Sequence, residues 1–536
     1  MHQCLPERRS FVQFVPPKKM STAIQLSLLL LQGAAAALGQ SDDAITFQSP
    51  GNPILADGSY YSADPAPLVV NNTLYIIAGR DAAAPNENGF VINEWEILST
   101  TTPKPDNNNN SSWTLHPSIG KPHEIFAWAA PGTAYAAQIV LGPDGRFYLY
   151  APVTQANTTA ADAFGIGVAV SESDSPLGPW TDAHPGGPVF SQLVPAPGNA
   201  IQNIDPTVLV DDDGRVYAYY GTFGELRGHE LDAGDMTTPV GDVAVVDTLS
   251  GFFEAPWLMK RGETYYMLYA ANDAGPDSPC TPTSYHACVA YGHAAAPLGP
   301  WTFGGVVLGI VSSTTSHPGA VELDGEWYLA YHTADAEGGG HFRRSVALDR
   351  LTWDDSVTPP AINKVVQTKR PQPDAAPSRN VAPKARASSV GGTPIQYWVE
   401  SLHDGRIPAN PLPPDYWASY DGDASPEEST LVYTWNETVA LNGVRMAFFA
   451  DQEAGASVGV PPPKAWYVEY KTAEGAWEHV VNASVYPLEV TDDPEEVGFD
   501  QVSTTAIRAV LTASGSGGVF GGVGVKEWEA LAPTAQ

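Results

Sequence analysis

Short strands that alternate with polar turns dominate the hydrophobic pattern of residues 44–370. Five of these strands are rich in aromatic residues, and each follows a turn rich in asparagine, aspartate or glycine. The strands are marked by Tyr75, Tyr148, Tyr217, Tyr266 and Tyr328. Glycine and Asx residues accept the positive φ values that tight hairpins require. The pattern therefore predicts an all-β repeat domain rather than a helical one.

Each of these tyrosines is preceded, 11 or 12 residues earlier, by a start position of its repeat. These positions hold Asp64, the pair Ala136 and Ala137, Asp205, Glu254 and His317. The blades of a β-propeller point their innermost strands at a common axis, so residues of equal phase meet there. We therefore expect a five-bladed β-propeller in which three carboxylates face one cleft.

The rest of the chain shows a change of pattern after the propeller. Residues 371–379 are rich in proline and poor in apolar residues, which predicts a linker. Residues 380–536 contain further strands without the propeller repeat, and they predict a separate β-sandwich of the jelly-roll type. The expected fold class is all-β throughout.

The first 40 residues have the layout of a secretory signal peptide and leader. Lys18 and Lys19 precede a short apolar run, and the small-residue stretch AAAALG follows it. The run is too short to span a bilayer. We expect translation of the protein to start at Met20. Sequons agree with a secreted, extracellular glycoprotein; they lie at Asn71, Asn109, Asn110, Asn157, Asn436 and Asn482.

The charge of the chain limits its binding partners, and its cysteines indicate a disulfide rather than a zinc site. The chain carries 60 acidic against 27 basic residues, a net charge of −33, which excludes nucleic acid and anionic membranes as partners. With Cys4 in the leader, Cys280 and Cys288 remain, and we predict a local disulfide between them. A zinc site would need more ligands nearby.

Several motifs, one in each of four blades and a further one in the last blade, resemble glycoside hydrolase family 43. They are ADP at 63–65, IDPTVLVDDDG at 204–214, FEAPWLMKR at 253–261, SHPGAV at 316–321 and FRRSVALDRLTW at 342–353. The family consists of five-bladed propeller enzymes that act on polysaccharides containing arabinose and xylose. The C-terminal part more loosely resembles a discoidin-type jelly roll.

The resemblance implies that Asp64 is the general base, that Glu254 is the general acid, and that Asp205 modulates the pKa of the acid. It also implies that Arg344 reaches the sugar from the last blade, and it requires no cofactor. Elementary chemistry agrees, since inversion needs one ionised and one protonated carboxyl group about 6.5–9.5 Å apart. Neighbouring acids raise one another's proton affinity, which favours a protonated Glu254.

Four other residues need separate interpretation, and two of them, His317 and Trp128, have alternatives. His317 is either a polar plug that hydrogen-bonds across the tunnel or, as in related enzymes, a ligand to a calcium ion on the axis. Trp128 either stacks on the sugar or packs in the core. His332 reads as a hydrogen-bonded strand residue. Arg343 should point to the opposite side of its strand from Arg344.

We therefore expect an exo-acting, inverting glycosidase, monomeric, that releases α-L-arabinofuranosyl or β-D-xylosyl units from plant cell-wall polysaccharide. The alternatives are an endo-arabinanase or exo-β-galactosidase of the same fold, or a secreted propeller lectin without turnover. The C-terminal domain is either a carbohydrate-binding module or a structural support. If it binds sugar, the candidate aromatics are Tyr397, Trp398, Tyr416 and Trp417.

Overall fold

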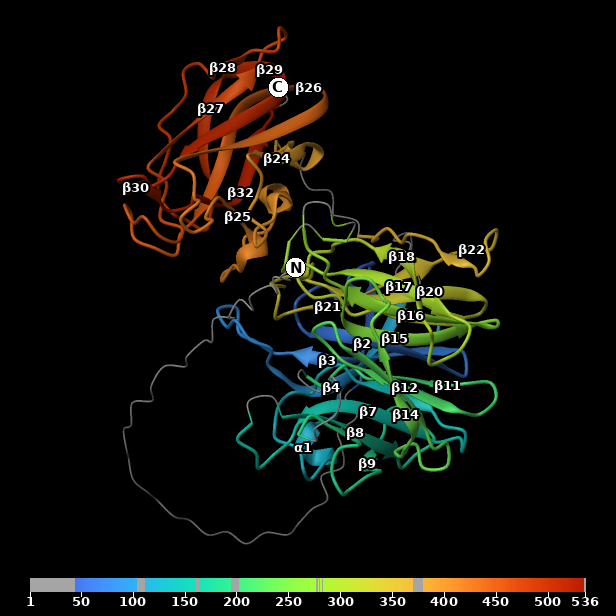
Figure 1. Ribbon diagram of the computed structural model, residues 1–536. Coiled ribbons are helices and arrows are strands. Elements are labelled where there is room, and N and C mark those ends of the chain that lie inside the picture. The colour runs from blue at the N-terminus through green and yellow to red at the C-terminus, as the bar shows by residue number, and fades with distance from the viewer. Residues whose placement is uncertain are drawn as a thin grey trace, which may run out of the picture. The chain divides into compact units, whose positions relative to one another are not determined.

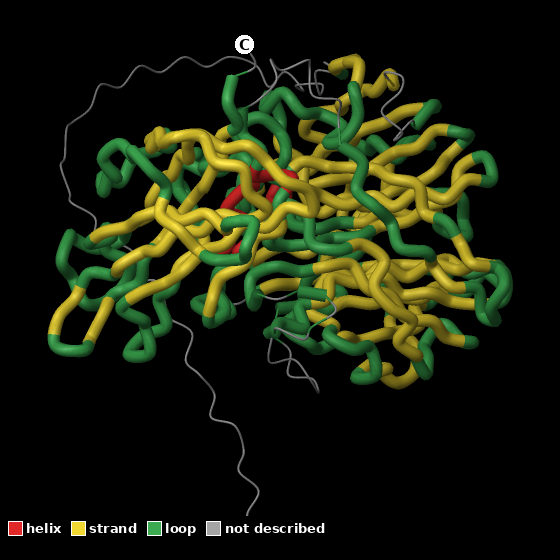
Figure 2. Tube along the Cα trace, turned by 90° about the horizontal axis from the view of Figure 1, so that it is seen from above, coloured by secondary structure: helices red, strands yellow, loops and turns green. Residues whose placement is uncertain are grey.

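Five antiparallel sheets follow one another along the first part of the chain in the computed structural model (Figure 1). The structure describes residues 44–103, 111–160, 163–193, 202–275, 278, 280–281, 283–369 and 379–534. The expected leader (1–40), the linker apart from Arg379, and the sequons at Asn109 and Asn110 lie outside these residues. Strands dominate the Cα trace, with a few short helical turns (Figure 2).

The sheets are the blades of the predicted propeller. Blade 1 holds β2 (Tyr61–Val70), β3 (Thr73–Asp81), β4 (Ile92–Thr100), β5 (Ser111–Gly120) and, at its outer edge, β1 (Ile45–Ser49). The short helix α1 (Pro122–Ile125) follows. Blade 2 holds β6 (Gln138–Leu141), β7 (Phe147–Thr154), β8 (Phe164–Ser171), β9 (Trp180–Asp182) and β10 (Phe190–Ser191).

The other blades have the same up-and-down order. Blade 3 holds β11 (Thr207–Val210), β12 (Val216–Tyr220), β13 (Leu226–Leu231) and β14 (Pro239–Val246). Blade 4 holds β15 (Phe252–Arg261), β16 (Thr264–Ala271), β17 (Cys288–Ala294) and β18 (Thr302–Leu308). Blade 5 holds β19 (Gly319–Leu323), β20 (Glu326–Thr333) and β21 (Ser345–Leu351). The small pair β22 (Trp353–Asp354) and β23 (Ala361–Ile362) follows.

The first strand of every blade faces the axis of the ring. These strands contact one another in the order β2, β6, β11, β15 and β19, and β19 returns to β2. The segment before β2 and the start of β2 complete blade 5, because Ile54 N–H donates to Val346 O and Ser62 N–H donates to Arg344 O, each at 2.8 Å. The ring is therefore closed by pairing the start of the domain with its last blade strand.

The marker tyrosines lie on the second strand of each blade, as the repeat predicted. Tyr148, Tyr217, Tyr266 and Tyr328 are buried, and Tyr75 is half-buried. The hairpin that joins β2 to β3 turns at Asn71 and Asn72, with φ of 47° and 60°. Two residues of positive φ give the turn that matches the twist of paired strands. The turn composition thus accounts for the hairpin positions.

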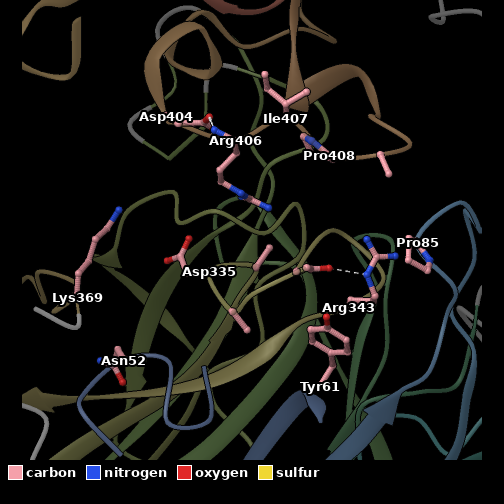
Figure 3. Close-up of a pocket in the computed structure, with 16 residues that line it drawn as sticks. Asn52, Tyr61, Pro85, Asp335, Arg343, Lys369, Asp404, Arg406, Ile407 and Pro408 are labelled. Atoms are coloured by element: carbon pink, nitrogen blue, oxygen red, sulfur yellow. Dashed lines mark hydrogen bonds between the residues drawn. The ribbon is translucent and has the colours of Figure 1, made fainter. Parts of the chain in front are cut away.

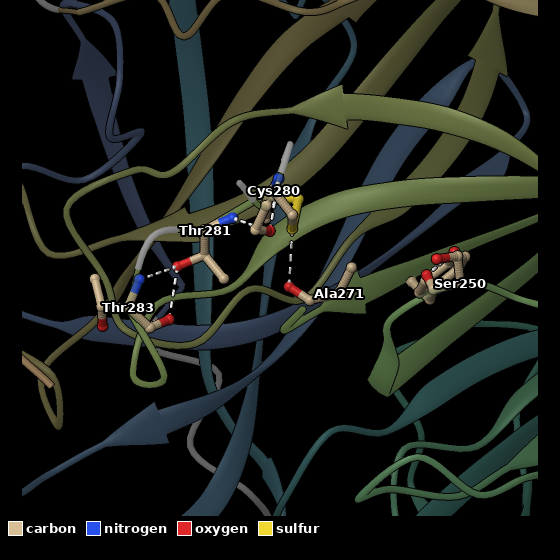
Figure 4. The surroundings of a disulfide bond; sticks show 8 residues. Ser250, Ala271, Cys280, Thr281 and Thr283 are labelled. Atoms are coloured by element: carbon tan, nitrogen blue, oxygen red, sulfur yellow. Dashed lines mark hydrogen bonds between the residues drawn. A yellow bond between two sulfur atoms is a disulfide. The ribbon is translucent and has the colours of Figure 1, made fainter. Parts of the chain in front are cut away.

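The predicted disulfide joins Cys280 to Cys288 in blade 4 (Figure 4). Cys288 opens β17, and Cys280 lies in the loop that follows β16. The Thr281 hydroxyl donates to Thr283 O at 2.8 Å within this loop. The bond therefore ties the loop to the start of the next strand.

The C-terminal part folds as a β-sandwich-like sheet with its own core. Its sheet consists of β24 (Arg386–Val390), β25 (Trp417–Ala418), β26 (Glu428–Phe449), β27 (Ala465–Lys471), β28 (Trp477–His479), β29 (Glu495–Thr512) and β32 (Gly524–Leu531). A separate hairpin pairs β30 (Gly515–Ser516) with β31 (Val519–Phe520), and the 3-10 turns are η1 (Ala382–Lys384), η2 (Val399–His403) and η3 (Pro413–Asp415). Tyr433 stacks on Trp528 in the core, with ring centroids 4.2 Å apart.

Three of the four aromatics that we considered for sugar binding in this domain are buried. Tyr397, Tyr416 and Trp417 are 6%, 5% and 1% exposed. Tyr416 stacks on Phe449 at 3.9 Å, and the indole N–H of Trp417 donates to the Thr393 hydroxyl at 3.1 Å. Proline and glycine around them indicated exposed loops, but the rings pack inward. They therefore offer no open face for a polysaccharide.

Candidate active site

The three predicted carboxylates come together in one cavity of about 360 Å³. Asp64 lies on β2, Asp205 two residues before β11, and Glu254 on β15. His317, before β19, and Arg344, before β21, line the same cavity. Since β2, β11, β15 and β19 begin blades 1, 3, 4 and 5, equal phase in the repeat did place the three carboxylates and His317 together.

A repeated backbone conformation positions two of these side chains. Asp64, Asp205 and Ala255 have φ of 57°, 56° and 57°, and each is followed directly by proline. Non-glycine residues occupy this left-handed region at a cost of about 1–2 kcal/mol. Strand pairing is irregular beside Asp64 and Glu254, as at β-bulges that re-aim side chains. Glu254 thus stands one residue before the position that Asp64 and Asp205 share.

Asp64 is held as a carboxylate. Arg344 Nη1 donates to its Oδ1 at 2.8 Å, and its own backbone N–H donates to His332 Nδ1 at 3.1 Å. Burial alone would raise the pKa of Asp64, but the charge of Arg344 and the nearby His332 and His317 outweigh burial and hold this pKa well below its usual range. Asp64 is therefore ionised near neutral pH.

The guanidinium of Arg344 is hydrogen-bonded to other side chains of the protein. Nε and Nη2 donate to the two carboxylate oxygens of Asp81 at 2.8 and 3.0 Å. Nη1 also donates to the Thr315 hydroxyl at 3.2 Å, and Nη2 reaches the second oxygen of Asp64 at 3.5 Å. The ring of Phe90 lies 4.8 Å from the guanidinium carbon. All five N–H groups thus have acceptors among the described residues, so the fork is not free for a sugar.

The pKa values of Glu254 and Asp205 are raised, in contrast to the lowered pKa of Asp64. Burial and the negative charge of Asp64 raise the pKa of Glu254 to about 7, and the Thr222 hydroxyl donates to its Oε2 at 3.4 Å. Burial, Glu254 and Asp64 raise the pKa of Asp205 well above its usual range, against the Ala255 N–H that donates to its Oδ2 at 3.1 Å. The pair therefore retains a proton near neutral pH.

His317 is a buried side chain beside Asp64. Its Nδ1 is 3.9 Å from Asp64 Oδ1. Burial, together with His332 and Arg344, lowers the pKa of His317 to about 4, so the ring is neutral. Calcium takes six to eight oxygen ligands, whereas this imidazole neighbours a guanidinium and a carboxylate that is already paired. No group of three or more His, Cys, Asp or Glu in the described ranges could hold a metal. His317 is therefore a buried, neutral group beside Asp64, and both interpretations of it stay predictions.

The sequence revealed only Phe253, the apolar neighbour of Glu254, in the apolar wall of the cavity. The wall is formed by Phe90, Ile92, Tyr135, Ile204, Phe223 and Phe253. Tyr135 comes from blade 2 and directly precedes the pair Ala136 and Ala137, so its position in the repeat could have indicated it. Phe90 and Phe223 lie in loops and Ile92 opens β4, where a single apolar residue carries no signal.

Trp128 does not line this cavity. Its indole N–H donates to Asp182 Oδ2 at 3.1 Å, and its ring packs against Phe126 at a centroid distance of 5.2 Å. The ring also packs against the main core of the propeller. Of the two interpretations of this tryptophan, the structure matches packing.

Arg343 points away from its neighbour Arg344, as the strand alternation predicted. Its Nε donates to Gly338 O at 2.7 Å, and its Nη1 donates to Ala84 O at 2.9 Å. Figure 3 shows Arg343 near Tyr61 in a second cavity that excludes the three carboxylates. His332 is buried on β20, and its Nε2 lies 3.1 Å from Thr315 O, so it is hydrogen-bonded as expected.

Comparisons with known proteins give the family. The sequence profile described as Glycosyl hydrolases family 43 matches residues 50–359. Xylosidase/arabinosidase 43A of Humicola insolens is 27% identical over 344 residues, which cover 55% of this chain and 94% of that protein. Arabinoxylan arabinofuranohydrolase of Bacillus subtilis is 27% identical over 398 residues, which cover 65% and 71%.

Among solved structures, a GH43 beta-xylosidase/alpha-arabinofuranosidase from a compost microbial metagenome is 25% identical, with a TM-score of 0.48. The match covers 60% of this chain and 98% of that one. The family profile spans more than half of the chain and contains all five blades' first strands, from β2 to β19. The protein therefore belongs to glycosyl hydrolases family 43.

Proposed function

We propose that this glycoside hydrolase is an exo-acting, inverting enzyme that releases α-L-arabinofuranosyl or β-D-xylosyl units from plant cell-wall polysaccharide. The observation that carries the proposal is the pairing, in one cavity, of an ionised Asp64 with a Glu254 whose pKa is raised to about 7. Relatives of the chain are named for xylosidase, arabinosidase and arabinoxylan arabinofuranohydrolase activities.

The size of the cavity favours action at a chain end. Ligand pockets span about 300–1,000 Å³, and this one, at about 360 Å³, lies near the lower limit. A cavity of that size suits one glycosyl unit and part of its neighbour. A long cleft for internal cleavage would need more room.

In the proposed reaction, Asp64 takes a proton from a water molecule as its oxygen attacks the anomeric carbon. The bond between that carbon and the glycosidic oxygen breaks, and Glu254 gives its proton to the departing oxygen. Water attacks from the face opposite the leaving group, so the anomeric configuration inverts. Asp205 and Glu254 are both buried and adjacent, so the two carboxyls resist full ionisation and the pair holds a proton near neutral pH.

Arg344 has a positioning role in this proposal instead of the sugar contact that the family resemblance implied. Its donors are directed at Asp64, Asp81 and Thr315. A fixed cation beside one carboxyl separates the proton affinities of two acids that are equally buried. No step of the proposed reaction uses a metal ion.

We also propose that the protein is secreted. The four sequon asparagines within the described residues, Asn71, Asn157, Asn436 and Asn482, are exposed, as glycan attachment requires. The Cys280–Cys288 disulfide agrees with an oxidising compartment. No helix in the described part of the chain is long and apolar enough to cross a membrane.

Product analysis tests the function itself. The protein should release free arabinose or xylose from nitrophenyl glycosides and from arabinan or arabinoxylan, as measured by chromatographic sizing over the first few per cent of reaction. Short oligosaccharides as first products would contradict exo action. The absence of turnover on every one of these substrates would instead favour a lectin.

Substitutions of the two carboxyls test their roles. Glu254→Gln and Asp64→Asn should each lower kcat by about 10²- to 10⁴-fold, because each removes a proton-transfer group. A substrate whose leaving group needs no protonation should restore activity to the Glu254 variant and not to the Asp64 variant. Glu263→Gln, an exposed acid in the hairpin turn between β15 and β16, is the matched control. Equal restoration of both variants would show that the roles are assigned wrongly.

Arg344→Gln tests the positioning role through pH. The folded-state pKa of Asp64 is depressed by Arg344 against burial, so removal of the cation should raise that pKa. The acidic limb of the pH profile of kcat/KM should therefore move to higher pH, with activity lost first in acid. Arg343→Gln changes the neighbouring arginine outside the cavity and should leave the limb in place. A raised KM with an unchanged acidic limb would mean that Arg344 binds sugar instead.

A further inference from the structure

Phe223 combines two unfavourable features at the mouth of the active-site cavity. It is 54% exposed, although phenylalanine is normally buried, and its φ is 52°. A bulky side chain at positive φ is a genuine conformational outlier. Such a residue persists where its surroundings hold it in place, and these outliers cluster at functional sites.

The turn that carries Phe223 is tied to the backbone beside both members of the acid pair, Asp205 and Glu254. Gly221 N–H donates to Ile204 O at 3.2 Å, next to Asp205, and Gly224 N–H donates to Phe253 O at 3.3 Å, next to Glu254. Gly221 has φ of 140°, and a Cβ there would lie 2.0 Å from the Glu225 carbonyl oxygen. The turn therefore requires glycine at this point, and it fixes Phe223 relative to the acid.

The residue before Phe223 contacts the acid directly, and a second ring supports Phe223. The Thr222 hydroxyl donates to Glu254 Oε2 at 3.4 Å. Phe253, which directly precedes Glu254, meets the ring of Phe223 edge to face, with centroids 5.3 Å apart and an interplanar angle of 87°. Both rings line the cavity. Two aromatic rings thus stand beside Glu254, while Arg344 and His332 surround Asp64.

The chemistry determines which part of the substrate meets these rings. Glu254 gives its proton to the glycosidic oxygen, so the sugar that departs with this oxygen must lie on the side of Glu254. The C–H face of a sugar ring is apolar and can pack on an exposed aromatic ring. An aromatic platform of this kind binds a sugar ring through the contact area between the two faces. It does not need a further side chain in the cavity to hydrogen-bond the hydroxyls of the sugar.

We propose that Phe223, supported by Phe253, is the platform for the sugar unit on the leaving-group side of the scissile bond. This inference rests on the proposed function and names a binding site within it. It assigns Phe223 to recognition of the polysaccharide chain and not to the chemical step. The strained and exposed conformation is then retained because it presents the ring to substrate.

Paired substrates test the platform. One is a disaccharide or trisaccharide of the unit that the enzyme releases, and the other is the glycosyl fluoride of the same unit, whose leaving group has no ring. Phe223→Ala should lower kcat/KM for the oligosaccharide by about five- to tenfold, mainly through KM. With the fluoride, kcat/KM should stay within about twofold of wild type. Phe223→Tyr, which keeps the ring, should restore oligosaccharide hydrolysis.

Controls separate this idea from structural effects and from the function. Phe303→Ala removes another exposed phenylalanine, which lies on β18 and is 40% exposed. This variant should keep the wild-type kcat/KM for both substrates. An equal loss on fluoride and oligosaccharide in Phe223→Ala, or no loss on either, would overturn the platform while leaving the glycosidase function intact. If wild-type protein turns over neither substrate, the proposed function itself fails. Thermal unfolding of each variant checks that the fold persists.

Discussion

The ion pair between Arg344 and Asp64 is the interaction on which the rest of the site depends. It joins the last blade to the first, since Arg344 precedes β21 and Asp64 lies on β2. The same arginine binds Asp81 at the end of β3 through its backbone N–H as well as its guanidinium. Its carbonyl oxygen accepts the Ser62 N–H that closes the ring. Arg344 therefore takes part both in the closure of the propeller and in the ionisation of the proposed base.

This cation also explains how three buried carboxyls acquire different properties. Burial raises the proton affinity of Asp64, Asp205 and Glu254 alike. Only Asp64 is in direct hydrogen-bond contact with Arg344, and its pKa alone falls. Its negative charge then adds to the pKa of Glu254. One carboxyl can thus act as the base and another as the acid because Arg344, the only cation among the described residues that line the cavity, is bonded to Asp64 and not to Glu254.

Repetition made much of the fold and site predictable from sequence. The phase of the marker tyrosines located the blades, and the same phase placed Asp64, Asp205, Glu254 and His317 in one cavity. Strand alternation separated Arg343 from Arg344 correctly. Even here the repeat was inexact, because the left-handed position falls on Ala255 rather than on Glu254.

Features outside the repeat were not predictable. Asp81 ends a strand like many other acids, and nothing local reveals that it holds Arg344. An isolated aromatic gives no sign of its surroundings, so Trp128 and Trp417 proved to be packed, whereas Phe223 is exposed. These outcomes depend on tertiary contacts between segments far apart in the chain, which periodicity and turn composition do not encode.

The stereochemistry of the first product tests the account most directly. It holds that water, activated by Asp64, attacks the face opposite the oxygen that Glu254 protonates. Proton NMR of the sugar formed in the first minutes of hydrolysis, before mutarotation, should show the anomer of configuration opposite to the substrate, such as α-xylose from a β-xyloside. Initial formation of the anomer with the substrate's own configuration would contradict it.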